Sequence, residues 1–381
     1  MKQPAYLDYN ATTPLDAGVL DAMLPFLQGY SGNPSSIHEL GRQARAALDD
    51  CRYRVASLLQ AKPSEIIFTS GGTESNNLAI QSVARSLRGR GRHLVTSAVE
   101  HHAVLHCFES LARDEGFELS IVPVDSDGVV NPEDVAAAIR GDTILVSIMA
   151  ANNEVGAIQP IQDVSLVCRD KGVLLHSDAV QAFGKLPLES IVPFQADLIS
   201  LCAHKFHGPK GAGILFAKSP LRLSPILKGG AQENESRPGT ENLPSIVGLT
   251  TALERFASKP VFESSVLTPL SERLISELTL LPGVTFRGPR SPLQRLPNTV
   301  AFTFEGWDSI SLLAALDLEG VFASSGSACS VGSLEPSHVL LAMGCDHKQA
   351  NSLVRFSLGR DTTLEDIDLA ISACRRILGC E

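Results

Sequence analysis

Seven short apolar runs, separated by segments of helical length, constrain the fold of this chain more than any other feature. Several of the runs lack the period-two alternation of a half-exposed strand, which predicts strands that are buried on both faces. Such strands are typical of a mostly parallel sheet with helices on both sides. The sequence therefore predicts an α/β fold with a seven-stranded sheet, built from residues 65–69, 93–97, 118–123, 143–149, 173–177, 196–200 and 213–216.

The last third of the chain has a different pattern. Helices are predicted over 243–256, toward 281, over 309–318 and from about 364, and a strand is predicted over 299–304. A chain of 381 residues is long enough for one large domain and a smaller one. We expect residues 15–258 to form the large α/β domain, and residues 1–14 with 259–381 to form a smaller α+β domain.

Composition excludes several classes of protein. The formal net charge is −10, whereas a nucleic-acid-binding surface needs a basic face. The first ten residues contain no apolar signal region, and no apolar run reaches the length of a membrane span. We therefore expect a cytoplasmic protein that binds neither nucleic acid nor membrane.

Eight cysteines are scattered along the chain without a CxxC pair or the spacing of a zinc site. In a cytoplasmic chain of this size we expect neither disulfides nor a bound metal. Most of these cysteines are expected to be small buried apolar residues, as for Cys107 and Cys168 in helix-like segments.

Polar residues follow five of the seven predicted strands, where open α/β sheets bind their ligands. After the first strand, Gly71, Gly72 and Thr73 precede a helix, and a helix N-terminus of this kind favours a phosphate. The alternative is a plain turn with Thr73 as the N-cap. After the second strand comes His101, which could stack on a planar ring or transfer protons, or could be an ordinary histidine in a surface loop.

Two further strand ends carry amides and a carboxylate. Asn152 and Asn153 follow the strand over 143–149, although asparagine is also common in turns. Asp178 follows the strand over 173–177, and an ionised carboxylate there needs a cationic partner, for which a pyridinium nitrogen would serve. Gln181 could then reach a neighbouring ring oxygen. The alternative for Asp178 is an N-cap.

Lys205 follows the strand over 196–200, between His204 and His207 in a loop bounded by glycine and proline. A lysine with a depressed pKa at such a place forms Schiff bases. The alternative is an exposed basic loop, which fits poorly with a position directly after a buried strand. Taken together, the five strand ends describe a pocket for pyridoxal 5'-phosphate (PLP).

The run over 203–211 resembles the PLP-lysine motif of cysteine desulfurases, which belong to the group-V aminotransferase-like enzymes of fold type I. Further resemblances follow in the expected order and cover essentially the whole chain. They lie at residues 6–13, 32–36, 69–77, 152–156, 237–242 and 324–336. The length of chain between Cys329 and residues 334–336 resembles that of the long-loop subgroup of the family, the nitrogen-fixation and iron–sulfur-cluster type.

This resemblance implies roles around the cofactor ring. It implies that Lys205 holds PLP as a Schiff base, and that Asp178 keeps the pyridine nitrogen protonated. It also implies that His101 stacks on the ring and moves protons. Gln181 and Asn153 would contact the ring on its oxygen side.

The resemblance also implies how phosphate and substrate are held. Gly72, Thr73 and His204 would bind the phosphate, together with Cys202, where the family usually has a serine. Thr240 would reach the phosphate of the other subunit, which implies a homodimer. Asn33 and Arg355 would bind the carboxylate of the L-cysteine substrate, because a guanidinium can bind a carboxylate bidentately.

Cys329 lies among small residues over 324–333, a composition that favours a loop able to move. By resemblance, it is the thiolate that takes sulfur from L-cysteine as a persulfide, leaving L-alanine. The sulfur would pass to an acceptor or scaffold protein for iron–sulfur cluster assembly or thiolation. The alternative is an incidental cysteine in a glycine- and serine-rich loop.

Other functions stay open at this point. A selenocysteine lyase or another group-V PLP enzyme, such as an aminotransferase, would share the same pocket. A protein outside the enzyme class would be an inactive PLP-binding platform that docks sulfur-transfer partners. Since every expected catalytic position is filled, the sequence favours the active desulfurase.

Overall fold

The apolar runs of the first part of the chain form one seven-stranded sheet in the computed structural model, which describes residues 4–29, 31–187, 190–256, 260–326 and 335–380. The strand order is β2-β8-β7-β6-β5-β3-β4, and only β8 runs antiparallel to its neighbours. The predicted mostly parallel sheet is thus confirmed. The strands are β2 (Ile66–Thr69), β3 (His93–Ser97), β4 (Glu118–Val122), β5 (Thr143–Ser147), β6 (Leu174–Asp178), β7 (Leu198–Cys202) and β8 (Gly213–Ala217).

Successive residues of a central strand face opposite sides of this sheet, and both sides are buried. Leu94 and Leu198 pack with one apolar cluster, whereas the next residues, Val95 and Ile199, pack with another. Side chains alternate across a strand, so burial on both faces requires an uninterrupted apolar run. This is the physical reason why these strands lack a polar–apolar alternation.

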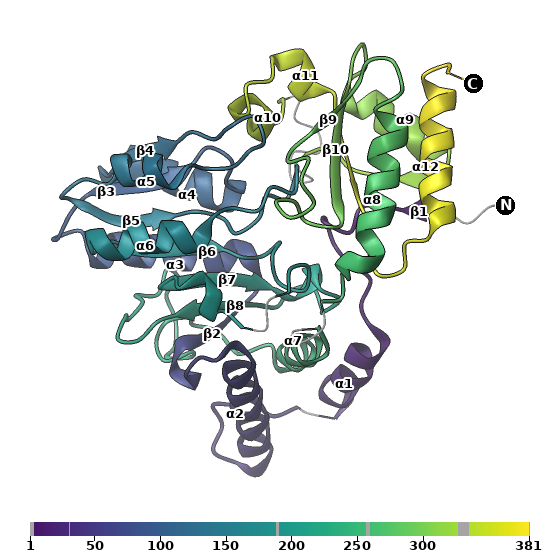
Figure 1. Ribbon diagram of the computed structural model, residues 1–381. Helices are drawn as coiled ribbons and strands as arrows, with labels where there is room; N and C mark the ends of the chain where they lie inside the picture. Colours follow the sequence, from purple (N-terminus) through teal and green to yellow (C-terminus); the bar gives the residue numbers. More distant parts are fainter. Residues whose placement is uncertain (1–3, 30, 188–189, 257–259, 327–334, 381) are drawn as a thin grey trace.

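Helices cover both faces of the sheet (Figure 1). One face carries α3 (Gly72–Ser86) and α4 (His102–Glu115), and the other carries α5 (Pro132–Ala138) and α6 (Ile161–Lys171). Cys107 in α4 and Cys168 in α6 are buried, as predicted. A further group of helices packs together below the sheet in the figure: α1 (Ala17–Gln28), α2 (Glu39–Leu59) and α7 (Leu243–Phe256). None of the described helices has the length and apolar character needed to cross a membrane.

The C-terminal part forms a separate three-stranded antiparallel sheet in the order β12-β10-β9. Its predicted elements are present, although the helix expected to run toward 281 ends at Leu278. The strands are β9 (Val284–Arg287), β10 (Thr299–Phe304) and β12 (Leu353–Ser357), and the helices are α8 (Ser264–Leu278), α9 (Ser309–Leu318), α10 (His338–Ala342), α11 (His347–Asn351) and α12 (Leu364–Ile377).

The N-terminal residues pair with the C-terminal part of the chain rather than with the large sheet. The short strand β1 (Ala5–Tyr6) pairs in parallel with β11 (Val321–Phe322) in a separate two-stranded sheet. Asp8 then forms a bridge to Ser357 of β12, and the Thr13 N–H donates to the His204 carbonyl at 3.0 Å. The segment over 8–13 therefore lies between β12 and the residues that follow β7.

Candidate active site

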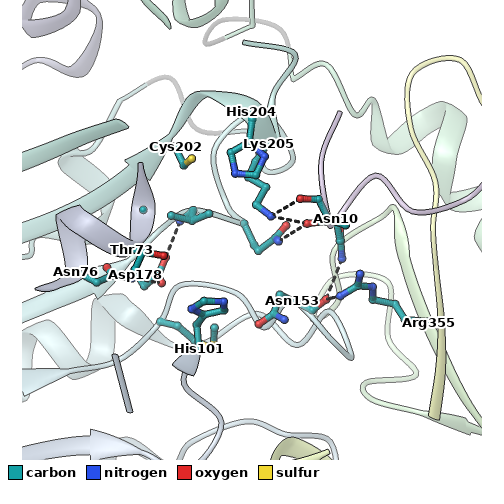
Figure 2. A pocket seen from close by; sticks show the side chains of 15 residues that line it. Asn10, Thr73, Asn76, His101, Asn153, Asp178, Cys202, His204, Lys205 and Arg355 are labelled. Atoms are coloured by element: carbon teal, nitrogen blue, oxygen red, sulfur yellow. Dashed lines mark hydrogen bonds between the residues drawn. The ribbon is translucent and has the colours of Figure 1, made fainter. Parts of the chain in front are cut away.

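A cavity of about 230 Å³ lies at the carboxyl ends of the parallel strands. The strands β2, β3, β5, β6 and β7 run in the same direction, so the residues that follow them meet at one edge of the sheet. Figure 2 shows how the side chains converge on this space. Among the residues that line it are Gly72, Thr73, His101, Asn153, Asp178, Gln181, Cys202, His204, Lys205 and Arg355.

Two of the candidate residues lie outside the cavity. Asn33 is exposed, and its side-chain oxygen accepts a hydrogen bond from the Ser35 N–H at 2.9 Å. Thr240 is also exposed. The structure of the single chain therefore brings neither of them to the other candidates, and their roles stay predictions. Cys329 lies outside the described residues.

Lys205 is placed by the short 3₁₀ turn that follows β7 directly. Its Nζ donates to the Asn10 and Ala11 carbonyls at 2.7 and 2.8 Å (Figure 2). Burial lowers the pKa of this amine to about 8. About a tenth of the amine is therefore neutral at pH 7, and the neutral amine is the form that attacks a carbonyl carbon.

Asp178 ends β6 and is only 5% exposed. Its Oδ2 accepts from Asn76 Nδ2 at 2.7 Å, and its Oδ1 accepts from the Val180 N–H at 3.0 Å. It caps no helix, and no cation of the described chain forms an ion pair with it. A buried carboxylate without a cationic partner is costly. A protonated pyridine nitrogen in the cavity would supply the missing charge.

His101 is the N-cap of α4 and lines the cavity. Its Nδ1 accepts from the Ala103 N–H at 3.1 Å, so the neutral ring carries its proton on Nε2. Burial lowers the pKa of the imidazole, which favours this neutral form. The alternative of an ordinary histidine in a surface loop does not fit, because His101 lines the cavity.

The first turn of α3 forms one end of the cavity. The N-cap is Gly71 rather than Thr73, and a glycine has no side chain to occupy the N–H groups of that turn. A neighbouring hollow of about 400 Å³ shares Gly72, Thr73 and His204 with the cavity. Burial lowers the pKa of His204 to about 3, so its ring is neutral. A helix N-terminus beside a hollow of this kind suits a phosphate.

Cys202 is buried beside Gly72 and Thr73, where a serine is usual in the resembled family. Its thiol donates only a long hydrogen bond, 3.8 Å, to the Ala212 carbonyl, and burial raises its pKa, so the thiol stays neutral. A hydroxyl is a stronger donor than a thiol. We expect Cys202→Ser to bind PLP about threefold to tenfold more tightly, since one added hydrogen bond contributes about 1 kcal/mol. Retention of PLP during dialysis against a competing aldehyde measures this.

The matched control is Cys168→Ser, which introduces the same change at a buried position in α6, away from the cavity. This control is expected to retain PLP as the unmodified protein does. If Cys202→Ser retains PLP as well as, or less well than, the unmodified protein, the side chain at position 202 does not contact the phosphate.

Arg355 projects from β12 into the opposite end of the cavity and is 2% exposed. Its Nη2 donates to Asp8 Oδ1 at 2.9 Å, and its Nη1 donates to the Asn153 and Gly326 carbonyls at 2.9 and 3.0 Å. Its Nε is buried and has no partner among the described residues. Arg355 lines the cavity, and a guanidinium is suited to a substrate carboxylate.

Sequence reasoning missed two side chains that hold the site together. The backbone carbonyl of Asn10 accepts a hydrogen bond from Lys205, and the side-chain Nδ2 of Asn10 donates to the Asn153 backbone carbonyl at 3.1 Å. Asn76 binds Asp178 and is 1% exposed. Both residues stood inside the motifs over 6–13 and 69–77, but nothing in the sequence gave their partners.

Comparisons with known proteins show which family the chain belongs to. A family model described as aminotransferase class-V matches residues 5–369. The curated protein "Cysteine desulfurase IscS" of Dictyoglomus turgidum is 47% identical over 382 residues, which cover 99% of this chain and 95% of that protein. A solved structure described as a NifS-like protein has a TM-score of 0.91 at 38% identity, covering 99% of this chain and 100% of that one. Another, described as SspA in complex with cysteine, has a TM-score of 0.82 at 35% identity, covering 94% and 100%. The chain belongs to the class-V aminotransferase family and, within it, to the cysteine desulfurases.

Proposed function

We propose that this cysteine desulfurase removes sulfur from L-cysteine in the cavity at the strand ends and carries it away on Cys329. Enzymes of this family depend on PLP, and the residues present fit that cofactor. The observation that carries the proposal is that two groups line the same cavity. One is the buried carboxylate of Asp178, with which no cation of the described chain forms an ion pair, and the other is the amine of Lys205 with its lowered pKa. When bound, PLP supplies an electron-withdrawing ring that stabilises negative charge at the substrate α-carbon.

The residues of the chain would each hold or move one group. Lys205 anchors the cofactor. Once the Lys205 amine has been released from the cofactor, it removes the α-proton of the substrate. Asp178 keeps the ring nitrogen protonated, because no cation of the described chain forms an ion pair with its carboxylate, which is then free to pair with that nitrogen. His101 presents an Nε2–H to the cavity, where it can donate to a developing negative charge. Arg355 binds the substrate carboxylate.

Sulfur transfer itself would take place on Cys329. Its thiolate attacks the sulfur of the substrate, so that an S–S bond forms and the bond between sulfur and the β-carbon breaks. The electron pair of the broken bond stays with the carbon fragment, which takes up a proton and leaves as L-alanine. Cys329 then holds the sulfur as a persulfide.

The described residues on either side of Cys329 are anchored beside the cavity. The Gly326 carbonyl accepts from Arg355 Nη1 at 3.0 Å, and Ser337 Oγ donates to Glu154 Oε2 at 2.5 Å. Three residues span at most about 10 Å of chain, which sets the reach of Cys329 from Gly326. Attachment at this distance from a residue of the cavity wall supports a role in taking up sulfur there.

The remaining assignments concern partners and organisation. The relative that was solved with cysteine supports L-cysteine as the substrate. A homodimer would give the exposed Thr240 its role at the phosphate of the other subunit, whereas Asn33 stays proposed, with Arg355, for the substrate carboxylate. The segment of Asn33 also carries Ile37, which is 91% exposed. We further propose a cytoplasmic location and a sulfur-acceptor or scaffold protein for iron–sulfur cluster assembly or thiolation.

We also retain the proposed division into residues 15–258 and residues 1–14 with 259–381. The pairing of β1 with β11 supports the place of the N-terminus in the smaller part.

Mass spectrometry of the PLP-loaded protein after incubation with L-cysteine tests the function directly. The expected result is one added sulfur on the peptide that contains Cys329, and the other seven cysteines serve as internal controls. Protein freed of PLP should show no such addition. If the fully loaded protein carries no sulfur on Cys329, or carries it equally on all accessible cysteines, the proposed function is wrong.

A further inference from the structure

Lys185 is a buried lysine beside the cavity that the proposed reaction does not use. It lies in the turns after β6 and is 1% exposed. Its Nζ donates to Asn10 Oδ1 at 2.6 Å and to Gln181 Oε1, and lies 5.3 Å from the centre of the Phe262 ring. Within the described chain no carboxylate forms an ion pair with it. A buried amine held only by two amide oxygens requires an explanation.

The bonds of Lys185 fix the orientation of the Gln181 amide. Gln181 Nε2 donates to the Asn10 carbonyl at 3.1 Å, and a carbonyl can only accept, so the nitrogen must face Asn10. The oxygen of the same amide therefore faces Lys185, which donates to it. Among the described residues, the Asn10 carbonyl is the only acceptor for Gln181 Nε2, which leaves its second N–H for a group in the cavity that Gln181 lines.

Asn10 is fixed in the same way. Its Oδ1 accepts from Lys185 Nζ and from Asn298 Nδ2, the latter at 3.0 Å. Its Nδ2 therefore points the other way and donates to the Asn153 carbonyl and to Thr299 Oγ1. The Asn10 carbonyl accepts from both Gln181 and Lys205. Lys185 thus binds the side-chain amides of Asn10 and Gln181, and Gln181 shares the Asn10 backbone carbonyl with the amine of Lys205.

We propose that Lys185 is a positioning residue that orients Gln181 through its hydrogen bond to the Gln181 side-chain oxygen, so that Gln181 donates an N–H to the ring oxygen of bound PLP. This inference rests on the proposed function for the place of PLP and for the role of Gln181. It adds a residue that touches neither cofactor nor substrate but determines which atom of the Gln181 amide faces them.

The position requires hydrogen-bond donors rather than a positive charge. Burial lowers the pKa of Lys185 well below its usual value, and the nearby cations Lys205 and Arg355 lower it further. A neutral amine still carries two N–H groups, which match its two amide acceptors. A side chain of similar length without donors, such as methionine, would fill the same space but leave both amide oxygens unpaired.

The pH dependence of the visible absorbance of bound PLP, measured without substrate, reports on the ring oxygen. A donor to that oxygen favours its ionised form and lowers the apparent pKa of the cofactor. In Lys185→Met, we expect this apparent pKa to rise by about one unit, which is a tenfold change in proton affinity. Lys185→Gln keeps N–H donors without a charge and should stay close to the unmodified value.

A double-mutant cycle with Gln181→Leu separates orientation from general damage. Gln181→Leu alone should raise the apparent pKa, and adding Lys185→Met should raise it no further. Phe262→Leu, which changes the packing against Lys185 but no hydrogen bond, should leave the apparent pKa unchanged although it lowers the melting temperature.

Two results would overturn the inference: an unchanged apparent pKa in Lys185→Met, or a shift of the same size in the Gln181→Leu background. If Lys185→Met does not fold, Lys185→Gln decides, because a shift of a full unit there would show that the charge is what matters. The absorbance is measured without sulfur transfer, so these outcomes are independent of whether Cys329 carries sulfur.

Discussion

Replacing Lys205 by alanine is expected to abolish alanine formation from L-cysteine, with a loss on the order of 10⁴-fold or more. Two functions disappear together, the covalent anchor for PLP and the amine that moves the α-proton. The amine in question has a pKa of about 8, and among the described residues Lys205 is the one lysine that lines the cavity. Release of alanine under saturating PLP measures the loss.

The cavity of Lys205→Ala should still bind PLP non-covalently, because the first turn of α3 and Asp178 are unchanged. Borohydride reduction should then fail to fix the cofactor to the protein. Lys218→Ala is the matched control, because Lys218 is exposed just after β8. The control should retain full turnover. Turnover of Lys205→Ala within tenfold of the unmodified enzyme would contradict the assignment.

Replacing Cys329 by alanine should eliminate sulfur transfer while leaving substrate binding intact. The thiolate is the only group proposed to accept sulfur, whereas PLP and L-cysteine are held by residues of the cavity wall. We expect the PLP absorbance to change on addition of L-cysteine as in the unmodified protein. Sulfide released in the presence of a thiol reductant should fall to background, a loss of at least about 10³-fold.

Cys345→Ala provides the control for Cys329→Ala, because Cys345 is partly exposed and has no role in the proposed reaction. It should release sulfide at the unmodified rate. Sulfide release that survives in Cys329→Ala would disprove the proposed carrier. Retained turnover of selenocysteine alone would instead favour a selenocysteine lyase.

Strands could be predicted from the sequence because their burial on both faces leaves a direct signal. The predicted run over 196–200 nonetheless became Leu198–Cys202, and 143–149 became Thr143–Ser147. The run over 143–149 extends two residues beyond its strand, whereas β7 begins and ends two residues after its predicted run, so the apolar pattern alone does not mark strand ends. The reversal of β8 follows from its short connection to β7, since a parallel crossover needs a dozen or more residues.

The candidate site could be predicted where its residues end a strand, as Asp178 does, or follow one closely, as Lys205 does. Residues that support these two were not predictable, because their partners are distant in sequence. Asn76 and Asp178 are separated by 102 positions, and Lys185 binds Asn10 across 175 positions. Asn33 and Thr240 are a different case: the single chain does not bring them to the cavity, and the resemblance alone assigns them roles.

The contacts of Asn10 have a consequence for how the protein is made. Its N–H donates to Ser357 Oγ at 2.9 Å, across 347 positions of the chain, while its carbonyl accepts from Lys205. Contacts of such long range form late, because closing a long loop costs entropy before any contact is gained. A nascent chain emerges N-terminus first, so Asn10 is synthesised long before Ser357 exists. A ribosome-bound fragment that lacks β12 therefore has an incomplete cavity, because β12 carries Arg355 and holds Asn10.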